Sequence, residues 1–97
     1  MNFHNIFREL TMIRAISAFA FDDYTIQVSL EDGRVIKMDM RYLKNLSGPV
    51  VDPLKDPKAF QKVFVRNGIV TWQTGYDIDP YYLVEAGVVV ENEATGS

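Results

Sequence analysis

The stretch NGIVTWQTGYDIDP, residues 67–80, carries the strongest information about the fold of this chain. Its opening Asn67-Gly68 predicts a tight β-hairpin, because a type I′ turn needs two residues that tolerate positive φ. The flanking runs 63–66 and 69–73 then pair antiparallel, and one face of the hairpin is wholly apolar. Trp72 falls on that face, so we predict that it packs in the core rather than serving as an exposed interaction hot spot.

The end of the same stretch predicts where a helix begins. Asp79-Pro80 combines an N-cap aspartate with proline at the first helical position, which predicts a helix over residues 81–86. Gly87 follows at the position where a left-handed glycine commonly ends a helix. Asp56-Pro57 repeats the signal and predicts a second short helix to about Lys62.

A second hairpin is predicted from residues 24–30 and 34–40, in which apolar and polar residues alternate. A two-residue turn would set apolar residues opposite polar ones along the whole ladder. A three-residue loop, 31–33, pairs Val28 with Ile36 and gathers the apolar side chains on one face. That loop needs a left-handed third residue, and Gly33 occupies the position.

The remaining elements are a first strand over 13–21 and a short β-run at 88–90. The sequence therefore predicts a single small α+β domain, with a mainly antiparallel sheet of about five strands and two or three short helices. We place this domain at residues 13–90. Residues 1–12 are expected to be a helical extension, and residues 91–97 a disordered tail.

Both ends of the chain carry apolar residues in patterns that favour docking or strand pairing. Phe3, Ile6, Phe7 and Leu10 recur at helical spacing, and a helix this short does not persist in water unless it docks. The run 88–90 is able to pair with a sheet edge of its own chain or of another. Two interpretations stay open: the ends seal the monomer's core, or they form a symmetric dimer.

Composition narrows the classes of function. The chain has 97 residues, a net charge of −3 and no cysteine, which excludes disulfides and zinc–thiolate sites. No apolar run approaches the roughly 20 residues that span a bilayer, and the N-terminus lacks signal-peptide features. His4 is the only histidine, so a transition-metal site or a histidine-based triad has little support. We expect a cytoplasmic protein without cofactors.

The charges are unevenly distributed. Residues 34–66 carry eight basic and three acidic groups, whereas residues 67–97 carry five acidic groups and no basic one. Lys55, Lys58 and Lys62 would share one helix face, which is ordinarily a solvated face. They could also contact phosphates or an acidic protein, but the acidic total argues against a dedicated nucleic-acid-binding module.

Residues 75–82 combine acidic and aromatic side chains. Asp77 and Asp79 could bind a cation, but a calcium loop would need glutamate where Val88 stands. The simpler interpretation is that Asp77 turns the chain and Asp79 caps the next helix. Among the tyrosines, Tyr81 and Tyr82 are adjacent on a helix and cannot both face inward.

From about Ile13 to Ala86 the chain resembles the bacterial family known as domain of unknown function 2442. The resemblance is carried by VSLEDG (28–33), MDM (38–40), PLKD (53–56) with Phe60, and above all by residues 67–80. It implies a small α+β domain with an antiparallel sheet. Members are similar to proteins encoded beside toxin-like partners, or to domains attached to a helix-turn-helix module, for which this chain has no room. The resemblance supplies no catalytic residue.

Together these observations favour a non-enzymatic interaction module that binds a protein partner, in an antitoxin-like or regulatory role, with a homodimer as an alternative. One alternative function is a small-ligand-binding or enzymatic site in loop 75–82, and another is weak nucleic-acid contact through the basic middle. The candidate partner-binding residues are Phe3, Phe7, Lys55, Lys58, Lys62, Tyr76, Tyr81 and Tyr82.

Overall fold

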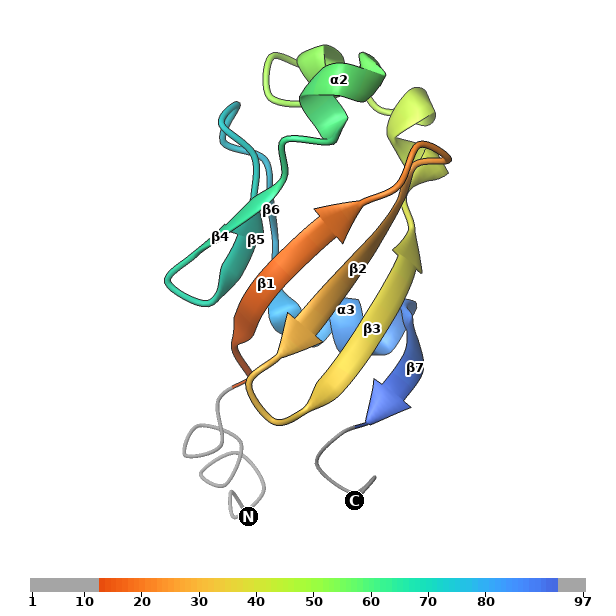
Figure 1. Ribbon diagram of the computed structural model, residues 1–97. Helices are drawn as coiled ribbons and strands as arrows, with labels where there is room; N and C mark the ends of the chain where they lie inside the picture. Colours follow the sequence, from red (N-terminus) through yellow and green to blue (C-terminus); the bar gives the residue numbers. More distant parts are fainter. Residues whose placement is uncertain (1–12, 93–97) are drawn as a thin grey trace, which may run out of the picture.

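The computed structural model describes residues 13–92, so the predicted helix over 1–12 and most of the predicted tail lie outside the described residues (Figure 1). The elements in order are β1 (Ala15–Ala20), β2 (Thr25–Leu30), β3 (Arg34–Asp39), the 3-10 turns η1 (Arg41–Asn45) and η2 (Asp52–Lys55), α2 (Pro57–Phe60), β4 (Phe64–Arg66), β5 (Ile69–Thr71), β6 (Asp77–Ile78), α3 (Pro80–Ala86) and β7 (Val88–Asn92).

The strands form two antiparallel sheets, with the orders β1-β2-β3-β7 and β4-β5-β6. Helix α3 lies behind the four-stranded sheet, while α2 and the 3-10 turns cover its upper end (Figure 1). The predicted α+β class and antiparallel pairing are confirmed, but the strands are divided between two sheets rather than gathered in one. The backbone N–H of Ala15 joins the sheets by donating to the carbonyl of Gly68 at 2.9 Å.

The β2–β3 hairpin has the predicted register. Val28 pairs with Ile36, Ile26 pairs with Met38, and all four side chains are buried. Gly33 has φ of +99° at the end of the three-residue loop, as the register requires.

The β4–β5 hairpin also forms as predicted, although its strands are shorter than the apolar runs. Asn67 and Gly68 have φ of +53° and +81°, and Val65 pairs with Val70. Gly68 is needed for a second reason. A Cβ there would lie 3.1 Å from Cζ of Arg14, whose side chain crosses the turn.

Both predicted N-caps are confirmed: Asp56 accepts from the N–H of Lys58 at 3.2 Å, and Asp79 accepts from the N–H of Tyr81 at 2.8 Å. Helix α2 ends at Phe60, before the expected Lys62, and residues 52–55 form a 3-10 turn ahead of it.

The predicted role of Gly87 was wrong. Gly87 has φ of −93° and ψ of −175°, an extended backbone that any residue adopts. The glycine is needed instead for close packing against β3. A Cβ at this position would lie 2.5 Å from Cγ2 of Ile36 and 2.8 Å from the carbonyl oxygen of Leu83.

The valine run, residues 88–90, forms part of strand β7. It pairs antiparallel with β3 of the same chain, with Val89 opposite Ile36 and Val88 opposite Lys37. The strand continues through Glu91 and Asn92, two residues that the sequence had assigned to the tail. Within the described residues, the other edge of β7 pairs with no strand.

Candidate functional site

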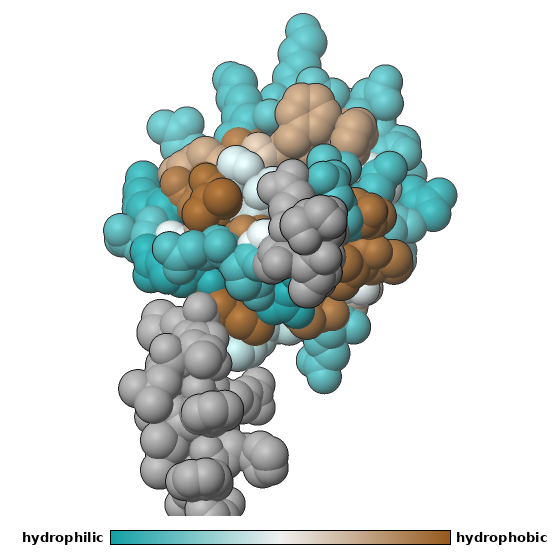
Figure 2. All heavy atoms as spheres, turned by 60° about the horizontal axis from the view of Figure 1, so that its bottom comes forward, coloured by the Kyte–Doolittle hydropathy of each residue, from teal (hydrophilic) through white to brown (hydrophobic). Residues whose placement is uncertain are grey.

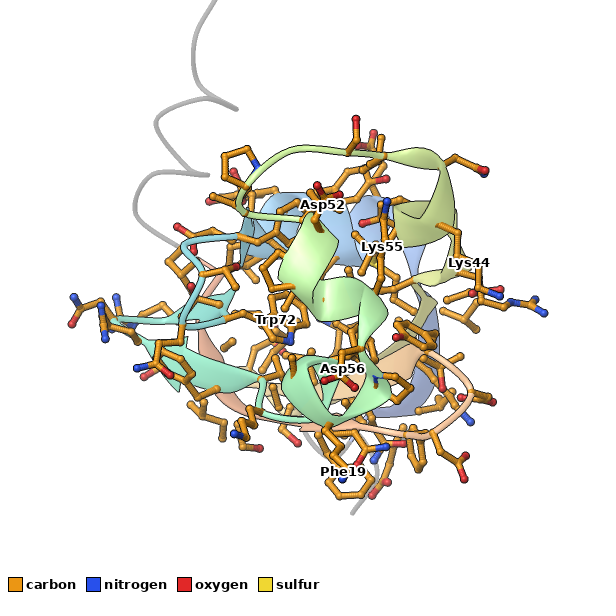
Figure 3. The ribbon with its side chains drawn as sticks, turned by 90° about the horizontal axis from the view of Figure 1, so that it is seen from above. Phe19, Lys44, Asp52, Lys55, Asp56 and Trp72 are labelled. Carbon is orange, nitrogen blue, oxygen red and sulfur yellow. The ribbon has the colours of Figure 1, made fainter. Side chains whose placement is uncertain are left out.

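Trp72 is the centre of a row of four aromatic rings. Its neighbours Phe60 and Tyr76 have ring centroids at 5.6 and 5.8 Å, and Tyr24 lies 4.5 Å beyond Phe60. The indole Nε1 of Trp72 donates to the carbonyl of Phe60 at 2.7 Å. Figure 3 shows Trp72 beneath the turns that carry Asp52 and Asp56. The prediction that Trp72 packs in the core is confirmed, and its ring is buried.

Tyr76 ends this row and is only half-buried. Its hydroxyl oxygen lies 3.4 Å from the hydroxyl oxygen of Tyr42. Burial raises the pKa of the Tyr42 phenol, and its contact with the Tyr76 hydroxyl raises that pKa further. The Tyr42 phenol therefore remains a neutral hydrogen-bonding group at physiological pH.

The two tyrosines of α3 differ in exposure, as their adjacency predicted. Tyr82 is 47 % exposed, whereas Tyr81 is half-buried beside the beginning of the helix. Of these two candidates, Tyr82 presents more of its ring to a partner.

The aspartates of the loop have structural contacts. The carboxylate of Asp77 accepts a hydrogen bond from the hydroxyl of Thr71, and Asp79 caps α3. Among residues 13–92, no group of three or more His, Cys, Asp or Glu side chains is arranged to hold a metal ion.

Two neighbouring pockets border Asp77. One, of about 360 Å³, is lined by Phe64, Arg66, Asn67, Ile69, Thr71, Trp72, Gln73, Gly75 and Asp77. The other, of about 500 Å³, is lined by Ile13, Ile69, Asp77, Asp79, Pro80 and Tyr81. Their polar groups could hydrogen-bond a small ligand. The Thr71 side chain that contacts Asp77 is buried at the edge of the first of these pockets.

The basic middle of the chain is partly neutralised. Lys55 pairs with Asp52 at 3.2 Å, and Arg34 and Arg41 pair with aspartates two positions earlier at 2.7 and 2.6 Å. Lys58 and Lys62 are exposed near the end of the molecule that α2 covers. The three candidate lysines therefore do not act as three free charges.

The open face of the four-stranded sheet was missed by sequence reasoning. Phe19 is 60 % exposed, and in Figure 3 its ring points away from Trp72 and the turns. Its ring packs edge-on against Phe21 at 4.9 Å, and the ammonium group of Lys37 lies 4.8 Å above the Phe21 ring. The signal was available, because Phe19 and Phe21 alternate with Ala18 and Ala20 in the first strand.

Strand β7 forms one border of this face. Val88, Val89 and Val90 are 64 %, 46 % and 50 % exposed. Figure 2 shows the apolar surface at the lower end of the molecule as several brown areas separated by teal polar ones. The sequence indicated that these valines were β-prone, but it did not reveal that they would form a sheet edge.

Comparison with known proteins assigns the chain to a family but shows no activity. No helix within the described residues is long and apolar enough to cross a membrane. Neither the curated proteins nor the solved structures contain a significant match to the chain. Residues 15–88 match a protein family described as "Protein of unknown function (DUF2442)". This match covers both predicted hairpins and both predicted helix starts, and the chain therefore belongs to that family of proteins of unknown function.

Proposed function

We propose that this chain is a non-enzymatic interaction module of the cytoplasm, which binds an extended segment of a partner protein along the edge of β7. The observation that carries the proposal is the exposure of Val88, Val89 and Val90 on an edge strand. An edge strand presents unpaired N–H and C=O groups, and proteins usually blunt such edges with charges, proline or a covering element. A partner strand would satisfy these groups and cover the valines.

The opposite edge of the sheet is less available. Strand β1 begins against the β4–β5 turn, where the N–H of Ala15 donates to Gly68. Residues 63–66 of the second hairpin lie beside β1 in Figure 1, so a partner strand would meet them there. Within residues 13–92, no strand pairs with the outer edge of β7.

Charge indicates the chemistry of the partner. Residues 67–97 carry five acidic groups and no basic one, and Glu91 lies within β7 itself. A segment that combines β-branched apolar residues with lysine or arginine would complement this edge. The family resemblance favours an antitoxin-like or regulatory role for such binding.

The test uses the product of the gene adjacent to that of this chain, coexpressed and purified with it, with affinity measured by calorimetry. The variant Val88→Lys/Val90→Lys places two charges on the exposed edge and is expected to weaken binding by tenfold or more, about 1.4 kcal/mol. The matched control is Phe19→Lys, on the opposite edge strand and similarly exposed. Because all three positions are exposed, the variants should keep the wild-type melting temperature.

Three outcomes would overturn the proposal. If the adjacent gene product does not bind, it is not the partner. If the edge variant binds it as tightly as the wild-type chain does, the contact does not lie on β7. Loss of binding with Phe19→Lys alone would place the contact on the sheet face. If sedimentation shows that the wild-type chain is a dimer and the edge variant a monomer, the occupant of the edge is a second copy of this chain.

A further inference from the structure

The pocket of about 500 Å³ is a groove between β5, β6 and the beginning of α3. Its walls include the apolar side chains of Ile13, Ile69 and Pro80 and the ring of Tyr81. The neighbouring pocket of about 360 Å³ shares two of its lining residues, Ile69 and Asp77. An apolar groove of this kind binds side chains of matching character.

The first residue that the structure describes lies in the wall of this groove. Ile13 lines it, and the next two residues are held firmly. The carbonyl of Arg14 accepts from the N–H of Glu31 at 2.8 Å, and the N–H of Ala15 donates to Gly68 at 2.9 Å. The side chain of Arg14 also crosses Gly68. Residues 1–12 therefore begin beside the groove, whatever path they take.

The sequence of residues 1–12 matches the groove in character. Phe3, Ile6, Phe7 and Leu10 recur at the spacing of one helix face. Leu10 is only three positions before Ile13, and twelve residues span about 18 Å as a helix, so several of these side chains are within reach. The groove is lined by Asp77 and Asp79, and residues 1–12 include one basic side chain, Arg8, together with Glu9 and His4.

We propose that residues 1–12 bind in this groove of their own chain, with Phe7 and Leu10 as the anchors nearest to Ile13. The segment would cover Ile69 and Tyr81, and Arg8 would lie close to the aspartates of the groove. This binding does not involve β7, so it can be tested independently of the proposed function.

The absence of cysteine allows a direct test by disulfide trapping in the full chain. The pairs Leu10→Cys/Ile69→Cys and Leu10→Cys/Tyr81→Cys sample two walls of the groove. The control pair is Leu10→Cys/Lys58→Cys, because Lys58 is exposed in α2 at the opposite end of the molecule from the start of β1 (Figure 1). A disulfide forms only where the two Cα atoms approach to about 4.4–6.8 Å.

At low micromolar protein, one or both groove pairs are expected to oxidise to monomers with an internal disulfide, while the control pair does not. A docked segment has an effective local concentration in about the millimolar range, which favours the internal bond. Disulfide-linked dimers from the groove pairs would show that a second copy supplies the segment and would overturn the proposal. Failure of both groove pairs, or equal oxidation of the control, would overturn it as well.

A second measurement avoids engineered cysteines. In the variant Phe3→Ser/Phe7→Ser, the amides of residues 69–71, 81 and 82 should exchange hydrogen faster than in the wild-type chain, while those of β2 and β3 keep their rates. Both substitutions lie outside the described core, so the fold should persist. Unchanged exchange at residues 69–71, 81 and 82 would contradict the proposed docking.

Discussion

The indole Nε1 of Trp72 donates a 2.7 Å hydrogen bond to the backbone carbonyl of Phe60, and the two rings stack at 5.6 Å. This pair connects the end of β5 to the end of α2. It joins the three-stranded sheet to the turns that cover the four-stranded one.

Trp72→Ala should therefore lower the free energy of unfolding by about 3–5 kcal/mol, the usual cost of removing a buried tryptophan. Trp72→Phe keeps a ring in the stack but leaves the Phe60 carbonyl without this donor, and should cost about 1–3 kcal/mol. Urea unfolding measures both changes. A loss below about 1 kcal/mol for the alanine variant would mean that the ring is not part of the core.

Gly87→Ala tests the packing role of this glycine. The backbone there accepts any residue, so a loss of stability must come from the contact of the new Cβ with Ile36 and the Leu83 carbonyl. We expect a loss of about 1–3 kcal/mol in urea unfolding. Gly33→Ala is the comparison, because its loss of about 1 kcal/mol or more comes from positive φ. Unchanged stability of Gly87→Ala would show that the helix end can move away from β3.

Acid should weaken the fold through two local ion pairs. Hydrogen bonds from Arg34 and Arg41 lower the pKa of Asp32 and of Asp39, respectively. A carboxylate with a lowered pKa contributes stability above its unfolded value of about 3.9, and this contribution is lost as the pH falls through the folded pKa. Both pairs are largely exposed, so the effect is small and screened by salt.

The measurement is the melting temperature between pH 7 and pH 3. Asp32→Asn/Asp39→Asn should flatten the fall at the acidic end at low ionic strength. If the variant and the wild-type chain have parallel profiles, other carboxylates govern the acid response.

Calcium or magnesium should leave the melting temperature unchanged. The carboxylate of Asp77 contacts the Thr71 hydroxyl, and Asp79 caps α3, so neither is arranged with a third ligand among the described residues. A ligand that binds the folded state raises the melting temperature. A rise of several degrees that Asp77→Asn abolishes would contradict this prediction and favour a ligand-binding or enzymatic function for loop 75–82.

Binding to DNA should be weak and should depend steeply on salt. All three lysines of the predicted patch are exposed, and Lys55 is paired with Asp52. Contacts from two or three lysines predict a slope of log K against log salt of about −2 to −3, without sequence preference. Fluorescence anisotropy with unrelated duplexes measures this slope. Tight, sequence-specific binding at physiological salt would contradict the prediction.

The sequence by itself determined the local geometry of this protein. Asn67-Gly68 and Gly33 specified their turns because few residues adopt positive φ without strain, and the register of each hairpin follows from its turn. Asp56-Pro57 and Asp79-Pro80 specified two helix starts, because the carboxylate satisfies a nearby backbone N–H whatever lies around it.

Only the tertiary structure decided how these pieces combine. The valine run pairs with β3 of the same chain, and the strands form two sheets that meet at Ala15 and Gly68. The role of Gly87 was misassigned for the same reason, because its constraint comes from Ile36 across the sheet and not from its own φ. The groove beside Ile13 likewise combines residues from β5, β6 and α3. Such contacts join residues distant in the chain, and local backbone preferences contain no information about which of them will meet.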